Sequence, residues 1–323
     1  MKIGLYDADS HNFPNLPLMK LSAWHKSRGD EVEFVFPMYR YDRIYVSKIF
    51  GDEYSTLQNL CLQADEVIYG GTGFAISIKN GKEVYTKSCD VDLPPEVEHI
   101  YPDYSLYPEL TEDTAYGFLT RGCPNNCEFC IVSQKEGLKS VKVADLSEFW
   151  SGQKYIKLLD PNLLACPARK ELLQQLIDSG AKVDFTQGLD AKFINEEIAT
   201  MLKSVKTERV HFAFDLMKNE AAVVRGLKTY KKICNLPDNK AIVYMLTNFN
   251  TTIDEDLYRI QKIKECGYIP DVRIYRKPTA PKVLKDLQRW CNNRLLYRSC
   301  DFMDYKPRAD GRTIRELYFG GGQ

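Results

Sequence analysis

The sequence predicts an α/β protein, with a small open α/β domain followed by a longer run of alternating strands and helices. Two observations support this class. Short runs of β-branched and aromatic residues alternate with stretches whose apolar residues recur at helical spacing. Gly, Pro, Asp and Asn stand at many junctions, where they cap helices or make turns. Such alternation with short loops is typical of parallel strands joined by right-handed crossovers.

The composition limits the kind of protein. The chain has 323 residues, of which 44% are hydrophobic and 27% charged, as in globular proteins of one large or two unequal domains. Its 44 basic residues equal its 44 acidic ones, so the overall charge indicates no polyelectrolyte partner. The first residues resemble a strand rather than a signal peptide, and no apolar run approaches the ~20 residues that cross a bilayer. We expect a cytoplasmic protein without a membrane partner.

Residues 1–95 are expected to form a small Rossmann-like α/β domain. A helix is predicted at residues 16–28, where Leu18 and Leu21 have helical spacing and Gly29 ends the helix. Strands are predicted at residues 2–7, 31–36, 43–49 and 66–69. Residues 96–114 follow as a proline-rich linker, and we expect three tyrosines, Tyr101, Tyr104 and Tyr107, to anchor it on the next domain.

Residues 115–280 contain six predicted strand–helix units. The strands are expected at residues 115–120, 155–159, 182–186, 209–214, 241–246 and 271–275. The helices are expected at residues 146–151, 171–179, 195–204, 219–234 and 254–266. Residues 281–323 form a basic helical extension that begins with a helix at 281–293. Because active sites of parallel α/β barrels form at the carboxyl ends of the strands, polar residues there are the first candidates for a site.

One stretch carries most of the chemical information: RGCPNNCEFC, residues 121–130. Its three cysteines, Cys123, Cys127 and Cys130, have the spacing C-x3-C-x2-C. Thiolates are the usual ligands of iron–sulfur clusters, and a cubane needs four ligands, so three thiolates leave one iron open for a small molecule. Gly122 and Pro124 favour a tight loop around such a group. A zinc loop with a distant fourth ligand is the alternative.

The other seven cysteines show no C-x2-C pairing. In a chain of this length without a signal peptide, free thiols fit a reducing cytoplasm better than a disulfide scaffold. We expect them to be mostly buried small apolar residues; they are Cys61, Cys89, Cys166, Cys234, Cys266, Cys291 and Cys300.

The segment TRGCPNNCEFC resembles the cluster loop of the radical S-adenosylmethionine (SAM) superfamily, whose motif places an aromatic residue before the last cysteine, here Phe129. The resemblance implies a partial (β/α)6 radical SAM barrel over residues 115–280. It also implies a [4Fe–4S] cluster on Cys123, Cys127 and Cys130, with SAM chelating the open iron. One electron would then cleave SAM to methionine and a 5′-deoxyadenosyl radical. A reductant such as flavodoxin or ferredoxin is the implied partner.

Polar residues at the ends of the predicted strands are the candidates for binding SAM, which offers an ammonium, a carboxylate, a ribose and an adenine. The alternative is that they are helix caps and turns, the commonest role of Asp and Asn in loops. By resemblance we assign Asp160 and Asn162 to the amino group, Lys192 to the carboxylate, Gln187 or Asp190 to the ribose, Phe129 to the adenine side, and Asp215 and Asn248 to two further strand ends.

The N-terminal domain resembles a shortened cobalamin-binding domain of the kind that precedes many radical SAM barrels. His11 follows the first strand in the segment DSHNFP, where that domain carries D-x-H-x-x-G, and Ser47 lies near its S-x-L. Pro14 replaces the glycine of the pattern, and the domain is one βα unit short. We therefore expect no stable binding of cobalamin.

Residues 273–315 differ from the rest in charge, with twelve Lys or Arg residues against four Asp. Trp290, Tyr297 and Tyr305 lie among them, an interleaving that suits phosphates with stacked bases. The alternative is a solvated basic face.

The resemblance thus implies a radical SAM enzyme that cleaves SAM reductively and starts radical chemistry on an unidentified substrate. If the basic segment binds that substrate, we expect an anionic one, either a phosphorylated small molecule or RNA. Three alternatives remain open. They are a cobalamin-dependent radical SAM methyltransferase, an RNA-modifying radical SAM enzyme without cobalamin, and a non-enzymatic iron–sulfur redox protein.

Overall fold

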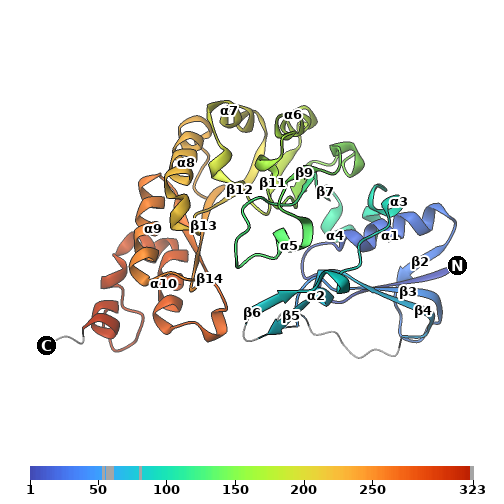
Figure 1. Ribbon diagram of the computed structural model, residues 1–323, viewed down its shortest axis with the longest axis horizontal. Helices are drawn as coiled ribbons and strands as arrows, with labels where there is room; N and C mark the ends of the chain where they lie inside the picture. The colour runs from blue at the N-terminus through green and yellow to red at the C-terminus, as the bar shows by residue number, and fades with distance from the viewer. Residues whose placement is uncertain (53–54, 56–61, 80–81, 321–323) are drawn as a thin grey trace. The chain divides into compact units, whose positions relative to one another are not determined.

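The computed structural model describes residues 1–52, 55, 62–79 and 82–320 (Figure 1). It is a mixed α/β structure with parallel sheets. The chain divides into two compact units, Met1–Val183 and Asp184–Gln323, which are described in turn. Cys61, one of the cysteines expected to be buried, lies outside the described residues.

The first unit begins with a four-stranded parallel sheet in the order β2-β1-β3-β4. Helix α1, Leu16–Ser27, packs on it; the Asn15 side chain accepts the backbone N–H of Leu18 and so caps the helix. Leu18 and Leu21 of α1 are buried against Ile3 and Leu5, and each such side chain stabilises the fold by about 1.5–3 kcal/mol. The predicted strands are confirmed as β1 (Lys2–Asp7), β2 (Glu31–Phe34), β3 (Tyr41–Ser47) and β4 (Ala64–Gly70).

Short elements that the sequence did not predict follow this sheet, because one helical turn or a four-residue strand gives little periodicity. Strands β5 and β6 pair antiparallel as a hairpin. The elements are α2 (Thr72–Ala75), β5 (Ile76–Lys79), β6 (Lys82–Tyr85), α3 (Pro95–Glu98) and α4 (Pro108–Thr111), with 3-10 turns at Lys87–Cys89 and Tyr104–Leu106.

The tyrosines of the predicted linker do anchor it, although not all on the same side. Tyr104 donates its hydroxyl to the carbonyl of Phe149 at 2.6 Å, and the hydroxyl of Tyr101 lies 2.7 Å from that of Ser151. Tyr107 instead donates to Asp7 at the end of β1, at 2.5 Å. Residues 96–114 therefore pack against both neighbouring parts of the first unit.

A six-stranded parallel sheet follows, in the order β14-β13-β12-β11-β10-β7. Within this sheet, each strand lies beside the previous strand of the same sheet, as expected when every crossover has the same hand. All six strands were predicted; they are β7 (Thr114–Gly117), β10 (Tyr155–Leu158), β11 (Lys182–Phe185), β12 (Thr207–Ala213), β13 (Ala241–Thr247) and β14 (Ile269–Ile274).

The later crossover helices agree with the prediction, but the first does not. Between β7 and β10 the expected helix at 146–151 is a single 3-10 turn, Leu146–Glu148, held by the reciprocal caps of Asp145 and Glu148 and ended by Phe149. The other helices are α6 (Arg169–Ser179), α7 (Glu196–Ser204), α8 (Glu220–Cys234), α9 (Ile253–Glu265) and α10 (Lys282–Asn292), with 3-10 turns at Leu163–Ala165, Ala191–Phe193, Met217–Asn219 and Lys277–Thr279.

In the second unit, alternate strand residues face the helices. Phe212 of β12 packs edge-to-face on Tyr230 of α8 and on Tyr268, with ring centroids 4.9 and 5.9 Å apart. The outer strand β14 is covered by α10: Asn292 accepts the N–H of Val272 at 2.7 Å, and Gln288 donates to its carbonyl at 2.9 Å.

The expectation of base-stacking aromatic residues in the C-terminal extension is wrong for Trp290 and Tyr305, because both are buried. Trp290 packs on Tyr297 and Phe302 and donates its indole N–H to the carbonyl of Cys300 at 3.0 Å. These aromatic side chains form the core that attaches the extension, which also includes α11 (Arg294–Ser299), a 3-10 turn at Phe302–Asp304 and a π-helical turn at Arg315–Phe319.

Part of the basic charge of this segment is neutralised internally. Arg308 makes two hydrogen bonds to the carboxylate of Asp286, at 3.0 and 2.6 Å. Lys282 and Arg289 on α10 are exposed, as expected for a basic face. Within the described ranges, none of the helices combines the length and the apolar composition that a membrane crossing requires.

Candidate functional site: the cysteine loop

The three motif cysteines lie on a loop that a two-stranded ribbon closes at its base. Strand β8 (Thr120–Arg121) pairs antiparallel with β9 (Val141–Lys142), and residues 122–140 between them form the cysteine loop. The loop also contains helix α5, Val132–Glu136. The N–H of Cys123 donates to the carbonyl of Gly137 at 3.1 Å, so the two ends of the loop are joined directly beyond the ribbon.

Gly122 has a conformation that other residues rarely adopt. Its φ angle is +87°, and a Cβ at this position would lie 2.1 Å from the carbonyl oxygen of Lys139. Only glycine permits both the left-handed backbone and this approach of the two chain segments. The glycine before the first cysteine is therefore required by the closure of the loop.

The sulfur atoms are half-buried in the loop. Cys123 Sγ accepts a hydrogen bond from the side-chain amide of Asn162, with an N···S distance of 3.5 Å. The N–H of Cys130 donates to the carbonyl of Cys127 at 3.0 Å, which turns the chain between the second and third cysteines. In the part of the chain that the structure describes, no three His, Cys, Asp or Glu side chains are grouped as a metal site.

The donor set nevertheless suits an iron–sulfur cluster in its chemistry. Three thiols lie on one closed loop, and an amide N–H already points to the sulfur of Cys123; hydrogen bonds to sulfur are a normal means of tuning such clusters. Of the six other cysteines that the structure describes, Cys166, Cys266 and Cys291 are buried as expected, Cys234 and Cys300 are half-buried, and Cys89 is exposed.

Asp160, predicted at the end of the second strand of residues 115–280, contacts the two residues Leu119 and Thr120 that lead into this loop. Its carboxylate accepts the backbone N–H and the hydroxyl of Thr120, both at 2.6 Å, and the N–H of Leu119 at 3.2 Å. The side chain is fully buried, and burial raises its pKa to about 6 although the hydrogen bonds oppose the shift. Asp160 thus joins the end of β10 to the start of β8.

Asn162 has two roles in the structure. Its side-chain oxygen accepts the N–H of Ala165 at 3.2 Å and caps the 3-10 turn that follows β10. Its amide nitrogen makes the contact with Cys123. Both residues assigned to the SAM amino group therefore contact the segment 119–123, which carries the first cysteine. Phe129 lies half-buried on the same loop, between Cys127 and Cys130.

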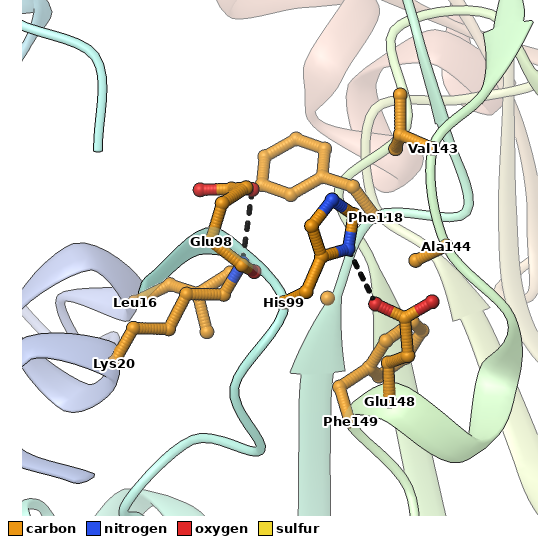
Figure 2. Close-up of a pocket in the computed structure, with 10 residues that line it drawn as sticks. Leu16, Lys20, Glu98, His99, Phe118, Val143, Ala144, Glu148 and Phe149 are labelled. Carbon is orange, nitrogen blue, oxygen red and sulfur yellow. Dashed lines mark hydrogen bonds and ion pairs between the residues drawn. The ribbon is translucent and has the colours of Figure 1, made fainter. Parts of the chain in front are cut away.

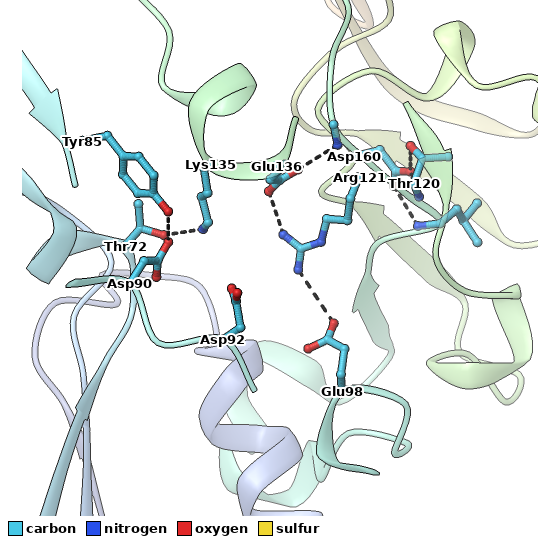
Figure 3. A network of polar contacts seen from close by, with 12 residues as sticks. Thr72, Tyr85, Asp90, Asp92, Glu98, Thr120, Arg121, Lys135, Glu136 and Asp160 are labelled. Atoms are coloured by element: carbon cyan, nitrogen blue, oxygen red, sulfur yellow. Dashed lines mark hydrogen bonds and ion pairs between the residues drawn. The ribbon is translucent and has the colours of Figure 1, made fainter. Parts of the chain in front are cut away.

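Glu136, which the sequence analysis did not single out, binds two consecutive residues at the entrance of the loop (Figure 3). One carboxylate oxygen lies 2.9 Å from the guanidinium of Arg121, and the other accepts the N–H of Gly122 at 3.0 Å. The guanidinium carbon of Arg121 also lies 3.4 Å from the ring centroid of Phe118, a cation–π contact. The sequence offered little to identify Glu136 as a residue that supports the loop, because a glutamate before a glycine at the end of a short helix is a common pattern.

In the second unit, the candidates after β11 make local contacts. Asp190 accepts the N–H of Lys192 at 3.1 Å, and so caps the turn Ala191–Phe193; the ammonium of Lys192 lies 3.7 Å from the same carboxylate. Gln187 is exposed. Asp190 therefore has the capping role that was considered as the alternative to SAM binding. Its carboxylate and the ammonium of Lys192 lie side by side at this strand end.

The candidates at the next two strand ends tie neighbouring strands together. Asp215 accepts the N–H of Leu246 at 2.7 Å, and burial raises the pKa of its carboxyl group. Asn248, at φ +66°, donates its amide to the carbonyl of Tyr275 at 2.7 Å. These contacts fix the carboxyl ends of β12, β13 and β14 relative to one another.

A row of polar side chains that the sequence analysis missed lies on the sheet face opposite to Phe212. His211 stacks on Tyr244, with ring centroids 4.8 Å apart and planes 13° apart. The guanidinium carbon of Arg273 lies 4.6 Å from the centroid of the Tyr244 ring, and the Nε of Arg273 forms an ion pair with Asp271. His211 is buried, and its Nδ1 has no hydrogen-bond partner within the described part of the chain. Period-two alternation of polar and apolar residues in these strands was the available signal.

Two hollows lie near the cysteine loop. A small pocket of about 20 Å3, room for one water, is lined by Lys20, Glu98, His99 and Glu148 among others (Figure 2). Lys20 donates to the carboxylate of Glu98 at 2.9 Å, and burial lowers the pKa of its ammonium group. An open groove of about 410 Å3 is lined by Pro124 of the loop, so this side of the loop is accessible from solvent.

The residues that match the cobalamin pattern take part in internal contacts. Ser47 accepts the amide of Asn15 at 2.9 Å, and Asp9 accepts the N–H groups of Ile49 and Phe50 at 2.8 and 2.9 Å. His11 is exposed.

Comparisons with known proteins give no assignment. No protein-family model matches the chain, and none of the curated proteins matches its sequence.

Proposed function

We propose that the protein is a radical SAM enzyme, with a [4Fe–4S] cluster on Cys123, Cys127 and Cys130. The observation that carries the proposal is the motif C-x3-C-x2-C on a loop closed at its base, which follows the first strand of a six-stranded parallel sheet. On this proposal the sheet is the partial barrel of that superfamily. When bound, the cluster and SAM supply one-electron cleavage of the SAM sulfonium and a carbon radical.

The residues of the chain have defined tasks in this proposal. The three thiolates hold the cluster, and the amide N–H of Asn162 stabilises negative charge on the sulfur of Cys123. Asp160 fixes Leu119 and Thr120 and thereby orients the strand from which the loop starts. Gln187, Asp190, Lys192, Asp215 and Asn248 remain the proposed polar contacts to SAM at the later strand ends.

The N-terminal sheet is not proposed as a cobalamin site. The side chains of Ser47 and Asp9 are already occupied by partners within the sheet and its loops. An absorption spectrum of a corrinoid that stays with the protein through gel filtration would contradict this part of the proposal.

The decisive experiment is anaerobic reconstitution with iron, sulfide and SAM, followed by reduction. We expect about four irons per chain, as for one cubane, and formation of 5′-deoxyadenosine. Changing Cys123, Cys127 or Cys130 to Ala should abolish both. Cys89→Ala is the matched control, because this thiol is exposed. Iron binding and SAM cleavage that persist in Cys123→Ala would contradict the proposal; retention of zinc without iron would favour a zinc loop.

A further inference from the structure

Two consecutive residues at the end of α5 point to opposite sides of the molecule's first unit. Glu136 contacts Gly122 at the entrance of the cysteine loop, whereas Lys135 contacts the turn that follows β4 of the N-terminal sheet (Figure 3). Because they are neighbours in one helix, movement of either contact is transmitted to the other.

On the first side, Glu136 holds the entrance of the loop by two charge-assisted hydrogen bonds, to Arg121 and to the N–H of Gly122. Its side chain is only 11% exposed, so water replaces these contacts poorly. The N–H of Cys123 bonds to Gly137, the residue after Glu136. The position of α5 therefore sets the position of the first cysteine.

On the second side, Lys135 donates to the hydroxyl of Thr72. Thr72 follows Gly71, whose φ is +101° and whose added Cβ would lie 2.3 Å from the carbonyl oxygen of Lys48. The N–H of Lys48 in turn donates to Gly70 at the end of β4, at 3.0 Å. Thr72 is thus held firmly on the N-terminal sheet. Burial lowers the pKa of Lys135, although the nearby carboxylate of Asp90 opposes the shift.

A second contact runs parallel to the first. Arg121 lies 3.9 Å from the carboxylate of Glu98, and Glu98 pairs with Lys20 of α1 at 2.9 Å. Arg121 is therefore placed between Glu136 of the loop and Glu98, which is bound to the N-terminal helix. Both contacts therefore reach Glu136, because Lys135 is its neighbour in α5 and Arg121 is its ion-pair partner.

We propose that Lys135 and Glu136 are positioning residues through which the N-terminal sheet holds the cysteine loop in its closed form. The N-terminal domain then acts as a support for the loop and needs no bound corrinoid. The coupling itself is a property of the apoprotein; its consequence for a cluster rests on the proposed function.

The test measures how fast the loop opens in the protein without metal. Alkylation of Cys123, Cys127 and Cys130 by iodoacetamide is followed by mass spectrometry of the full chain. We expect Glu136→Ala to accelerate it about a hundredfold, the factor for loss of two charge-assisted hydrogen bonds of ~1.5 kcal/mol each. Lys135→Met and Thr72→Val should accelerate it about fivefold, since each removes one hydrogen bond of ~1 kcal/mol.

The controls separate this coupling from general damage. Glu128→Gln removes an exposed carboxylate of the same loop, and Lys139→Met an exposed ammonium; both should alkylate at the wild-type rate. Thr72→Ser keeps the hydroxyl and should restore that rate. If Thr72→Val and Lys135→Met behave as wild type, the N-terminal sheet does not hold the loop, and the inference is wrong.

Reconstitution then distinguishes this inference from the proposed function. Where the variants loosen the apo loop, their clusters should lose iron faster to a chelator and show a broadened electron paramagnetic resonance signal. A wild-type protein that binds no iron, but whose loop still loosens in Thr72→Val, would overturn the proposed function and leave the coupling intact. If the variants alkylate at the wild-type rate and the protein binds iron normally, the coupling is wrong and the proposed function stands.

Discussion

Asp160 receives both the backbone N–H and the side-chain hydroxyl of Thr120, at 2.6 Å each, in a site closed to solvent. This pair joins the end of one strand of the large sheet to the short strand from which the cysteine loop starts. Because the carboxyl group is buried, its protonation state affects the stability of the whole connection.

Asp160 should make the protein less stable as the pH rises from about 4 to about 6. Its folded-state pKa of about 6 lies above the model value of 3.8, so the folded state binds the proton more tightly. The stabilisation is complete below the unfolded pKa and is lost as the pH passes the folded one, in total about 3 kcal/mol at 1.36 kcal/mol per pKa unit. Asp160→Asn should remove this slope from urea unfolding measured between these pH values; an identical slope in the variant would contradict the assignment.

Gly122→Ala should open the cysteine loop. The added Cβ meets the Lys139 carbonyl oxygen at 2.1 Å, and the positive φ adds strain of about 1–3 kcal/mol. Gly137→Ala is the matched control, because φ is +93° there but nothing lies within 4 Å of the new Cβ. Thermal unfolding should show a larger loss for Gly122→Ala, and hydrogen exchange of the Cys123 amide should accelerate in that variant. Equal losses for both would mean that the close approach does not matter.

His25 and His211 should both titrate below 6.5. Burial is the largest cause of the lowered pKa of each, although Asp30 opposes it for His25, and Asp184 and the Phe185 carbonyl oppose it for His211. Their contribution to stability is therefore present above pH 6.5 and is lost on acidification, since the unfolded chain takes up the protons first. Nitrogen-15 NMR titration, with assignments from His25→Gln and His211→Gln, measures both values. A midpoint at or above 6.5 would contradict the burial described for that ring.

Asp256→Ala should destabilise the second unit by about 3–5 kcal/mol, because it leaves a buried charge without its carboxylate. Arg259 is fully buried, pairs with Asp256 and donates to the carbonyls of Phe214, Asp215 and Leu246 at 2.8–3.0 Å. The double variant Asp256→Leu/Arg259→Met should recover part of the loss in urea unfolding. A single variant within 1 kcal/mol of wild type, as for exposed pairs, would show that the pair is not shielded from water.

The long elements of this fold were predictable, because each buries enough apolar surface to leave a clear period in the sequence. The strand predicted at 241–246 is β13, Ala241–Thr247, and the helix predicted at 171–179 is α6, Arg169–Ser179. The helix predicted at 146–151 was wrong because the reciprocal caps of Asp145 and Glu148 stabilise one turn as well as they start a longer helix.

The cysteine motif was readable from spacing alone, but its supports were not. Glu136 lies fourteen positions from Gly122, and only the folded ribbon brings them together. Among the strand-end candidates, Asp190 and Asn162 carry the caps that Asp and Asn make locally, so their type alone could not separate capping from binding. The burial of Trp290 agrees with its place beside Leu287 on the apolar face of the predicted helix 281–293, whereas Tyr305 is buried although its neighbours in the sequence are charged.

The cover over β14 has a consequence for self-association. Val272 offers its N–H and carbonyl outward from the outer strand, and Asn292 and Gln288 occupy both groups. A strand with such groups open is a template for pairing with another chain. By occupying these groups, helix α10 protects β14 from pairing with the edge strand of another copy. A chain that ends before Lys282 should therefore expose this edge and self-associate.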